Sequence, residues 1–402
     1  MDFGFTKEEE EFRQEVRGFC QKEVTPELIE DYEREAGYTP RIWEFLRKLG
    51  ARGWLAPQWP KEYGGLESDY MKKFIIEQEV TRAIGVRQAV RNVGNGMAGP
   101  IILRYGTEEQ KKRFLPPIAK GEVEYCLGYT EPQAGSDLAA LELRAAEASV
   151  GKGEVLAEEK GGYFIMNGQK MFNTAAHYAQ FHWLGARTDW ENPKKHRGIS
   201  LFVVDLKSPG ITIRPMKTMS DLMTNEVFYD DVKLPKANMI GEMNRGFYYI
   251  MEAVDLERVT PSGALEHIFG EMLKYVKETE INAKPLSKDP WVRQRLAQLQ
   301  IEISSARLLD WRIAWMIHNN TVPNYQSAMS KAYSTELVQR IYNTWVDIMG
   351  LFGQLKPGSK WAPLGGRIER EHRRSVIETI YRGTSEIMRV IIAARGLELP
   401  RE

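Results

Sequence analysis

The sequence is poor in several features that mark whole classes of protein. Only two of its 402 residues, Cys20 and Cys126, are cysteines, too few for a disulfide framework or a thiolate-based zinc or iron–sulfur site. The 55 Lys and Arg residues balance 55 Asp and Glu residues, so net charge favours neither nucleic acid nor an anionic membrane surface as a partner. No apolar run approaches the roughly 20 residues of a membrane-spanning helix. We therefore expect a cytoplasmic protein that binds no nucleic acid, does not insert into membranes and keeps its thiols reduced.

Several motifs of common enzyme classes are also missing. No G-x-G-x-x-G follows a predicted strand, and neither a phosphate-binding G-x-x-x-x-G-K-[ST] nor a G-x-S-x-G nucleophile elbow occurs. The six histidines never form H-x-x-x-H, so a metal would need scattered ligands and we predict no metal site. The N-terminus lacks the basic and apolar regions of a secretory signal.

The first part of the chain has helical periodicity. Thr6 and Glu9 form a capping-box pattern, and apolar residues then recur at helical spacing. Further helices are predicted at 42–49, 71–83, 90–105 and 108–119. Residues 1–122 are therefore predicted to form an all-helical domain.

The period then changes to that of strands. Residues 163–174 contain Asn167-Gly168 between two apolar runs, which predicts a β-hairpin with a type I′ turn at this pair. Short β-like runs follow at 182–186, 199–204, 211–214 and 226–232. A compact β domain is predicted for residues 123–237.

Helical patterns return after this β region. They begin near Gly246, are interrupted near Pro261, and continue at 290–318, 326–349 and 384–394. Residues 238–402 are predicted to form a helical bundle. The expected fold is α+β, with an N-terminal all-α domain, a middle β-barrel-like domain and a C-terminal four-helix bundle.

Two segments combine turn residues with polar side chains. Tyr129-Thr-Glu-Pro-Gln-Ala-Gly-Ser-Asp137 follows a strand-like run, and Ile380-Tyr-Arg-Gly-Thr-Ser-Glu-Ile-Met-Arg389 contains the start of a terminal helix. Taken alone, the first is equally consistent with an anion-binding loop and with an ordinary capped turn. The second, alone, is a helix cap.

Together and in this order, the two segments resemble the signatures of the acyl-CoA dehydrogenase family, T-E-P-x-x-G-S-D and I-Y-E-G-T-x-E-I-x-R. Trp59-Pro-x-x-Tyr-Gly-Gly65 and the run from Gly168 to Thr174 agree with the same family. The resemblance implies a flavoprotein that holds FAD between the β domain and the C-terminal helices. It also implies an acyl-CoA substrate, a homotetramer with a heterotetramer as the alternative, and an electron-transferring flavoprotein as electron acceptor.

The chemistry implied by the resemblance needs a carboxylate base for the α-proton, flavin N5 for the β-hydride, and donors at the thioester oxygen. Ser136 would lie where the cofactor meets the CoA chain. Matching motif positions assigns the cofactor contacts to Leu127, Tyr129, Thr130, Ser136, Phe172, Thr174, Thr384 and Glu386. Ordinary packing is the alternative reading of each position.

The sequence departs from the family at the catalytic position. Most members carry a glutamate between Ile-Tyr and Gly-Thr, but this chain has Arg382, and an arginine cannot act as a base at neutral pH. The D-x-E-R run at 255–258 resembles isovaleryl-CoA dehydrogenase and long-chain relatives, and makes Glu257 the candidate catalytic base. Arg258 would then assist CoA binding, and Arg382 would offer its backbone N–H to the thioester oxygen. The alternative for Glu257 is a solvated helix carboxylate.

A second departure concerns the acyl pocket. Gly85-Val-Arg-Gln-Ala89 resembles the stretch of glutaryl-CoA dehydrogenase whose arginine holds the distal carboxylate of the substrate, and Arg87 matches that arginine. With Arg91 and Arg382 it suggests a carboxylate-bearing acyl group, branched or aromatic, of the class of glutaryl-CoA or benzylsuccinyl-CoA. The alternative for Arg87 is a surface arginine in an ion pair.

Two cofactor motifs of the family are not recognisable. Its Arg-x-x-Phe is absent around 282–286, where Lys284 is the candidate substitute, and its Gln-x-x-Gly-Gly is replaced by Asp347-Ile-Met-Gly-Leu351. These departures leave two alternatives open. The chain could be a non-catalytic or partner-dependent subunit of a heteromeric dehydrogenase, or it could use altered chemistry such as oxidation coupled to decarboxylation.

Overall fold

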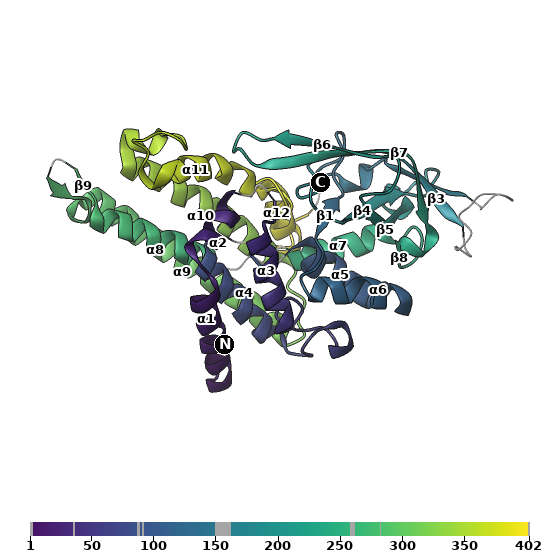
Figure 1. Cartoon of the computed structure of the whole chain (residues 1–402), viewed down its shortest axis with the longest axis horizontal. Helices are drawn as coiled ribbons and strands as arrows, with labels where there is room; N and C mark the ends of the chain where they lie inside the picture. Colours follow the sequence, from purple (N-terminus) through teal and green to yellow (C-terminus); the bar gives the residue numbers. More distant parts are fainter. Residues whose placement is uncertain are drawn as a thin grey trace.

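The computed structural model describes residues 3–34, 37–86, 89–90, 92–148, 162–257, 262–281 and 283–400. Helices from both ends of the chain lie together on one side of the molecule, and a β-sheet lies on the other (Figure 1). This is the three-domain α+β arrangement predicted from the sequence. No helix within these ranges is both long and apolar enough to cross a membrane.

The N-terminal part is helical, as predicted. Thr6 caps the first helix through its Oγ1, which accepts from the N–H of Glu9 (3.2 Å), while the Glu9 carboxylate accepts from the N–H of Thr6 (2.7 Å). The helices are α1 (Lys7–Glu23), α2 (Pro26–Arg34), α3 (Pro40–Ala51), α4 (Tyr70–Ile84), α5 (Gly99–Tyr105) and α6 (Glu108–Ala119).

The middle part is an eight-stranded sheet. Its strand order is β6-β7-β3-β2-β4-β5-β8, and β1 pairs with β4 in parallel. The strands are β1 (Tyr125–Gly128), β2 (Arg144–Ala148), β3 (Tyr163–Lys170), β4 (Phe181–Arg187), β5 (Ile199–Asp205), β6 (Ile211–Lys217), β7 (Met223–Pro235) and β8 (Met239–Ile240).

The predicted hairpin at Asn167-Gly168 is wrong, because the residues on both sides of the pair belong to the single strand β3. Residues on either side of the pair bond to the same partner strand, β7, with a register shift between Met166 and Gly168. Gly168 adopts a φ of +140° at this bulge. The Asn-Gly pair thus supplies positive φ to a bulge, where the pattern predicted a turn.

Side chains of the sheet alternate between two cores, as the period of two requires. Trp183 and Val203 face the helices α5, α6 and α7 (Gly246–Glu257), whereas Leu184 and Val204 face a second core inside the curved sheet. Figure 1 shows α5, α6 and α7 along this side of β4 and β5. The sheet is therefore anchored on the helical part through one face.

The C-terminal part is the predicted helical bundle. Its core joins α8, α9, α10 and α11 through residues such as Met272, Leu299, Trp345 and Ile368. The elements are α8 (Gly263–Glu278), the short strands β9 (Glu280–Ile281) and β10 (Lys284–Pro285), α9 (Pro290–His318), α10 (Tyr325–Met349), α11 (Arg367–Glu378) and α12 (Ser385–Ile391). The sequence analysis did not predict α11, which is rich in arginine and glutamate. The interruption predicted near Pro261 falls outside the described residues.

The bulge at Gly168 can be tested by substitution. An added Cβ would lie 3.0 Å from Leu143 Cα, and a φ of +140° is strained for alanine. We expect Gly168→Ala to lower the free energy of unfolding by about 1–3 kcal/mol in urea denaturation.

Gly18→Ala is the matched control, because Gly18 lies within α1 with nothing within 4 Å of an added Cβ. It should raise the free energy of unfolding by up to about 1 kcal/mol. Equal effects of the two substitutions would contradict the strain at the bulge.

Candidate active site

A buried ion pair holds the loop that follows β1. Lys170, the last residue of β3, places its Nζ 2.6 Å from Glu131 Oε1, and the two side chains are 0% and 2% exposed. Nζ also donates to the carbonyl of Tyr129 (3.2 Å). Burial lowers the pKa of Lys170 to about 8, against the attraction of Glu131. The ammonium therefore stays charged at neutral pH.

The Glu131 carboxylate also gathers backbone donors from further along the loop. It accepts from the N–H groups of Glu142 (2.6 Å) and Leu143 (2.8 Å) and from the side-chain amide of Gln133 (2.8 Å). A buried carboxylate needs several donors to offset its desolvation. One side chain thus fixes both ends of the 129–143 loop.

Arg187 on β4 holds the same loop from its other side. Its guanidinium donates to the carbonyls of Leu141 (2.9 Å), Ala139 (2.6 Å) and Lys195 (2.9 Å). Burial lowers the pKa of Arg187, although nearby carboxylates oppose this. Since two buried cations bind the loop, it is a rigid edge of the sheet.

Phe172 projects from the segment beside this loop. Its side chain is 59% exposed although it is a large aromatic residue, and its φ is +59°. Both neighbours are anchored, because the Met171 N–H donates to the carbonyl of Thr130 (2.9 Å) and the Asn173 side chain donates to that of Leu127 (2.7 Å). A strained backbone that is held in place and presents an aromatic ring to the outside is typical of a binding site.

The other predicted cofactor residues of the middle part lie along the same edge. Leu127 is in β1, and Tyr129 and Thr130 follow it directly. Ser136 and Thr174 are exposed, which leaves their hydroxyls accessible to a ligand. The hydrogen bonds from Met171 and Asn173 bring the 127–130 and 171–174 segments together.

This edge fits a flavin. Asn173 Oδ1 is buried and accepts no hydrogen bond from the described residues, although it lies next to the exposed Phe172 ring. An isoalloxazine ring offers a flat aromatic face with polar edges, which the Phe172 ring and the hydroxyl of Thr174 complement.

Thr384 and Glu386 lie on another element, at the start of α12. Thr384 is the N-cap, and its Oγ1 accepts from the N–H of Ile387 (3.2 Å). The backbone N–H of Glu386 and the Thr384 hydroxyl lower the pKa of the Glu386 carboxyl. Their contacts are those of a helix cap, and their predicted role toward the cofactor stays a prediction.

Arg382 turns its side chain back onto the preceding residue. Its φ is +57°, its guanidinium carbon lies 4.4 Å from the centre of the Tyr381 ring, and its Nη2 donates to the Tyr381 hydroxyl (2.6 Å). That hydroxyl in turn donates to Glu378 (2.9 Å). The positive charge is thus held within an Arg–Tyr–Glu chain at the C-terminal end of α11.

The remaining predicted residues cannot be placed. Glu257 is the last residue of α7, but its side chain lies outside the described residues. Arg258, Arg87 and Arg91 fall entirely outside them.

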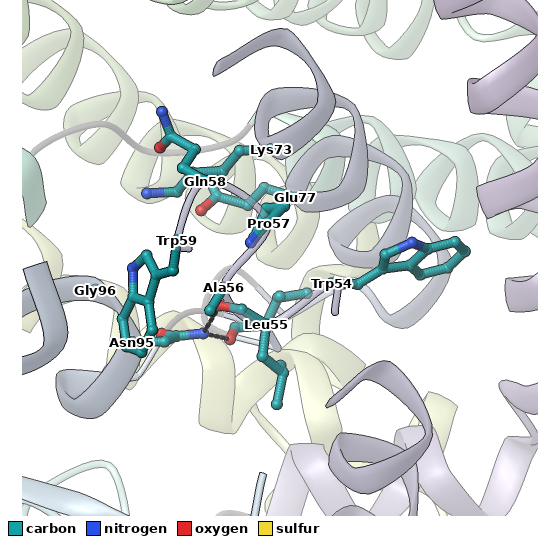
Figure 2. Close-up of a pocket in the computed structure, with 11 residues that line it drawn as sticks. Trp54, Leu55, Ala56, Pro57, Gln58, Trp59, Lys73, Glu77, Asn95 and Gly96 are labelled. Carbon is teal, nitrogen blue, oxygen red and sulfur yellow. Dashed lines mark hydrogen bonds between the residues drawn. The ribbon is translucent and has the colours of Figure 1, made fainter. Parts of the chain in front are cut away.

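A small pocket lies beside the segment predicted to carry these acyl-binding arginines. It encloses about 340 Å³ including its open mouth, and Val90 and Asn95 are among the residues that line it. Figure 2 shows Asn95 on one side of this pocket and Lys73 and Glu77 on the other. The Asn95 amide donates to the carbonyls of Leu55 (3.0 Å) and Val90 (2.9 Å), which fixes the pocket wall.

Sequence analysis missed the buried cations that shape the site. Lys170 has no other charged residue within nine positions in the sequence. Its partner Glu131 was interpreted only as part of a motif. The one available signal was a lysine at the end of an otherwise apolar strand, since buried lysines are almost always paired. The Arg382–Tyr381–Glu378 chain carried no such signal.

Comparisons with known proteins match this chain to one family along nearly its whole length. Three family models match: the acyl-CoA dehydrogenase N-terminal domain (residues 6–122), middle domain (126–232) and C-terminal domain (244–397). The acyl-CoA dehydrogenase FadE26 of Mycobacterium tuberculosis is 33% identical, over 100% of this chain and 99% of its own.

Two solved structures are similar over 100% of both chains. They are the Tcur3481-Tcur3483 steroid ACAD, with a TM-score of 0.87 and 31% identity, and the ChsE4-ChsE5 complex from Mycobacterium tuberculosis, with a TM-score of 0.85 and 33% identity.

The buried ion pair can be tested by removing one partner. Lys170→Met leaves the Glu131 carboxylate buried without its cation, so we expect a loss of about 3–5 kcal/mol in the free energy of unfolding. Adding Glu131→Gln should recover part of this loss, because the double variant buries no charge. Denaturant titration measures both.

Lys48→Met is the matched control. Lys48 is ion-paired with Glu23 (2.8 Å) but is 43% exposed, so its loss should cost less than about 1 kcal/mol. Similar costs for the two lysine variants would show that the buried pair does not hold the loop.

Proposed function

This chain belongs to the acyl-CoA dehydrogenase family, and on that premise we propose that it dehydrogenates a carboxylate-bearing acyl-CoA with Glu257 as the base. Members of the family are FAD-dependent flavoproteins, oxidoreductases that act on CH–CH bonds. The substrate class and the residue roles are the parts that we propose.

The observation that carries the proposal is the exposed Phe172 ring on an edge held by one buried ion pair and a buried arginine. A large aromatic ring that is exposed on strained, anchored backbone offers a flat contact surface for a ligand. FAD, when bound, supplies the acceptor for the hydride that leaves the β-carbon. The residues that would hold it are Leu127, Tyr129, Thr130, Ser136, Phe172, Thr174, Thr384 and Glu386.

Glu257 would take the α-proton of the thioester. It ends α7, and Ile250 and Ala253 of this helix are fully buried in the core that the helix shares with the sheet. This helix is therefore fixed against the sheet and α5. A carboxylate can accept the proton, and the guanidinium of Arg382, at the usual position of the base, cannot.

The chain would also polarise the thioester and bind CoA. The Arg382 backbone N–H is the proposed donor to the thioester oxygen, where negative charge develops as the α-proton leaves. The Arg382 guanidinium contacts the ring and the hydroxyl of Tyr381, which is consistent with a role for the backbone N–H alone. Arg258 would contact CoA, and Ser136 would lie between the cofactor and the CoA chain.

Arg87 would hold a carboxylate on the acyl group. A guanidinium forms two parallel hydrogen bonds with a carboxylate, which suits it to this task. Support comes from the sequence resemblance alone.

The assembly is also a proposal. A homotetramer with an electron-transferring flavoprotein as electron acceptor is the first candidate. The second is a partner-dependent subunit of a heteromeric dehydrogenase. It is supported by the two similar solved structures described above, because each is named for two proteins. Protein expressed alone that is insoluble or lacks FAD would support the second candidate.

The catalytic assignment can be tested by anaerobic titration with acyl-CoAs while the flavin absorbance is followed. The flavin absorbance of the wild-type protein should bleach. Glu257→Gln should slow the bleaching by at least about 10²-fold, as expected for loss of a general base. Glu252→Gln is the control on the same helix, since Glu252 is bound by Arg104 (2.7 Å) and Tyr105 (2.8 Å). Bleaching of Glu257→Gln at the wild-type rate would refute the assignment.

The substrate assignment can be tested with Arg87→Ala. Loss of a buried bidentate partner should raise KM for a dicarboxylic acyl-CoA by the equivalent of about 2–5 kcal/mol, and leave KM for a neutral acyl-CoA nearly unchanged. Arg52→Ala, which removes an exposed arginine paired with Glu15 (2.9 Å), should change neither. Equal increases for both substrates in Arg87→Ala would exclude carboxylate recognition there.

A further inference from the structure

A second, larger pocket opens between the ends of the helical parts. It encloses about 680 Å³ including its mouth and is bounded by α8, α10, α11 and the end of α4. Tyr381 and Glu378 line it at one end of α11, and Arg367 lines it at the other. These ends are about 16 Å apart, because an α-helix rises about 1.5 Å per residue. The pocket therefore begins next to Arg382 and extends away from it.

Carboxylates outnumber cations among the described residues of this wall. Arg367 donates to both Glu33 and Glu271, the latter at 2.8 Å through Glu271 Oε1. A second arginine lies 3.5 Å from Glu371, and Glu378 accepts from Tyr381. Four glutamates thus face two arginines. This excess of negative charge disfavours a carboxylate and favours a group that donates a hydrogen bond.

One carboxylate oxygen in this wall is left over. Glu271 Oε2 is buried and has no hydrogen-bond partner among the described residues. The His267 ring lies beside it, with Nε2 at 3.7 Å, beyond hydrogen-bond distance. A buried carboxylate oxygen without a donor is costly, so this atom marks a place for a ligand donor.

His267 is fixed opposite that oxygen. Its Nδ1 lies 2.7 Å from the carbonyl of Arg82, and a carbonyl only accepts, so Nδ1 carries a hydrogen and Nε2 faces the pocket. Gly85 allows this placement, because an added Cβ there would lie 2.6 Å from the imidazole ring. An oxygen atom can lie about 2.8 Å from both Nε2 and Glu271 Oε2, which is a normal hydrogen-bond length.

We propose that this pocket receives the far end of the acyl group and that Glu271 and His267 bind a hydroxyl group there. This inference rests on the proposed function, since the acyl group enters beside Arg382. The hydroxyl donates to Glu271 Oε2, and its oxygen accepts from Nε2 when the imidazole is protonated. The length of the pocket selects a long or ring-containing acyl group.

The test compares three acyl-CoAs of equal length by isothermal titration of the FAD-loaded protein, with its partner subunit if one co-purifies. Dodecanoyl-CoA, ω-hydroxydodecanoyl-CoA and dodecanedioyl-CoA differ only in the terminal group. The hydroxylated ligand should bind about 10- to 100-fold more tightly than dodecanoyl-CoA, as expected for a hydrogen bond to a charged group. The dicarboxylic ligand should bind no more tightly than dodecanoyl-CoA.

Substitutions then locate the effect. Glu271→Gln should reduce the preference for the hydroxyl to less than about 3-fold, because the acceptor loses its charge. His267→Asn serves as a second variant if the first does not fold. Glu302→Gln is the matched control, an ion-paired glutamate of α9 (2.7 Å to Arg340) outside the pocket, and should keep the full preference.

Equal affinities for the hydroxylated and plain ligands, or a preference that survives in Glu271→Gln, would overturn the inference while leaving the proposed function intact. Failure of every tested acyl-CoA, neutral or carboxylate-bearing, to bleach the flavin would instead refute the proposed function, and the inference with it.

Discussion

The structure of the site depends on one buried ion pair, that of Lys170 with Glu131. The pair connects the end of β3 to the loop after β1, and its carboxylate collects donors from Gln133, Glu142 and Leu143 as well. Because a buried carboxylate is stable only when its oxygens are satisfied, the loop can close in only one arrangement. Phe172, two residues beyond Lys170, takes its exposed position from the same anchor.

A different electrostatic arrangement governs the substrate side. At the position where the family signature has its glutamate, this chain carries Arg382, and the Tyr381 ring and hydroxyl hold its guanidinium. The Tyr381 hydroxyl donates a hydrogen bond to Glu378, which lines the second pocket. Arg382 thus contributes, through Tyr381, to the polar wall of the pocket.

The N-terminal and C-terminal helices meet across this pocket through Arg367. Its guanidinium contacts Glu33 of α2 and Glu271 of α8, although it belongs to α11. Burial raises the pKa of Glu33, and the attraction of Arg367 opposes this shift. Residues more than 300 positions apart in the chain therefore share one wall.

Local patterns in the sequence determined much of the fold. The capping box at Thr6, the apolar periodicity of the long helices and the alternation of the strands act over a few residues, and all appear where predicted. The two signature segments identified the family for the same reason, since each is contiguous. Asn167-Gly168 was misread, because whether such a pair makes a turn or a bulge depends on the strand opposite it. Only the tertiary structure decided that β7 spans both sides of the pair, that Lys170 meets Glu131, and that Arg382 folds onto Tyr381. Each of these depends on partners or backbone angles that no local pattern encodes, because burial and charge pairing are properties of the assembled chain.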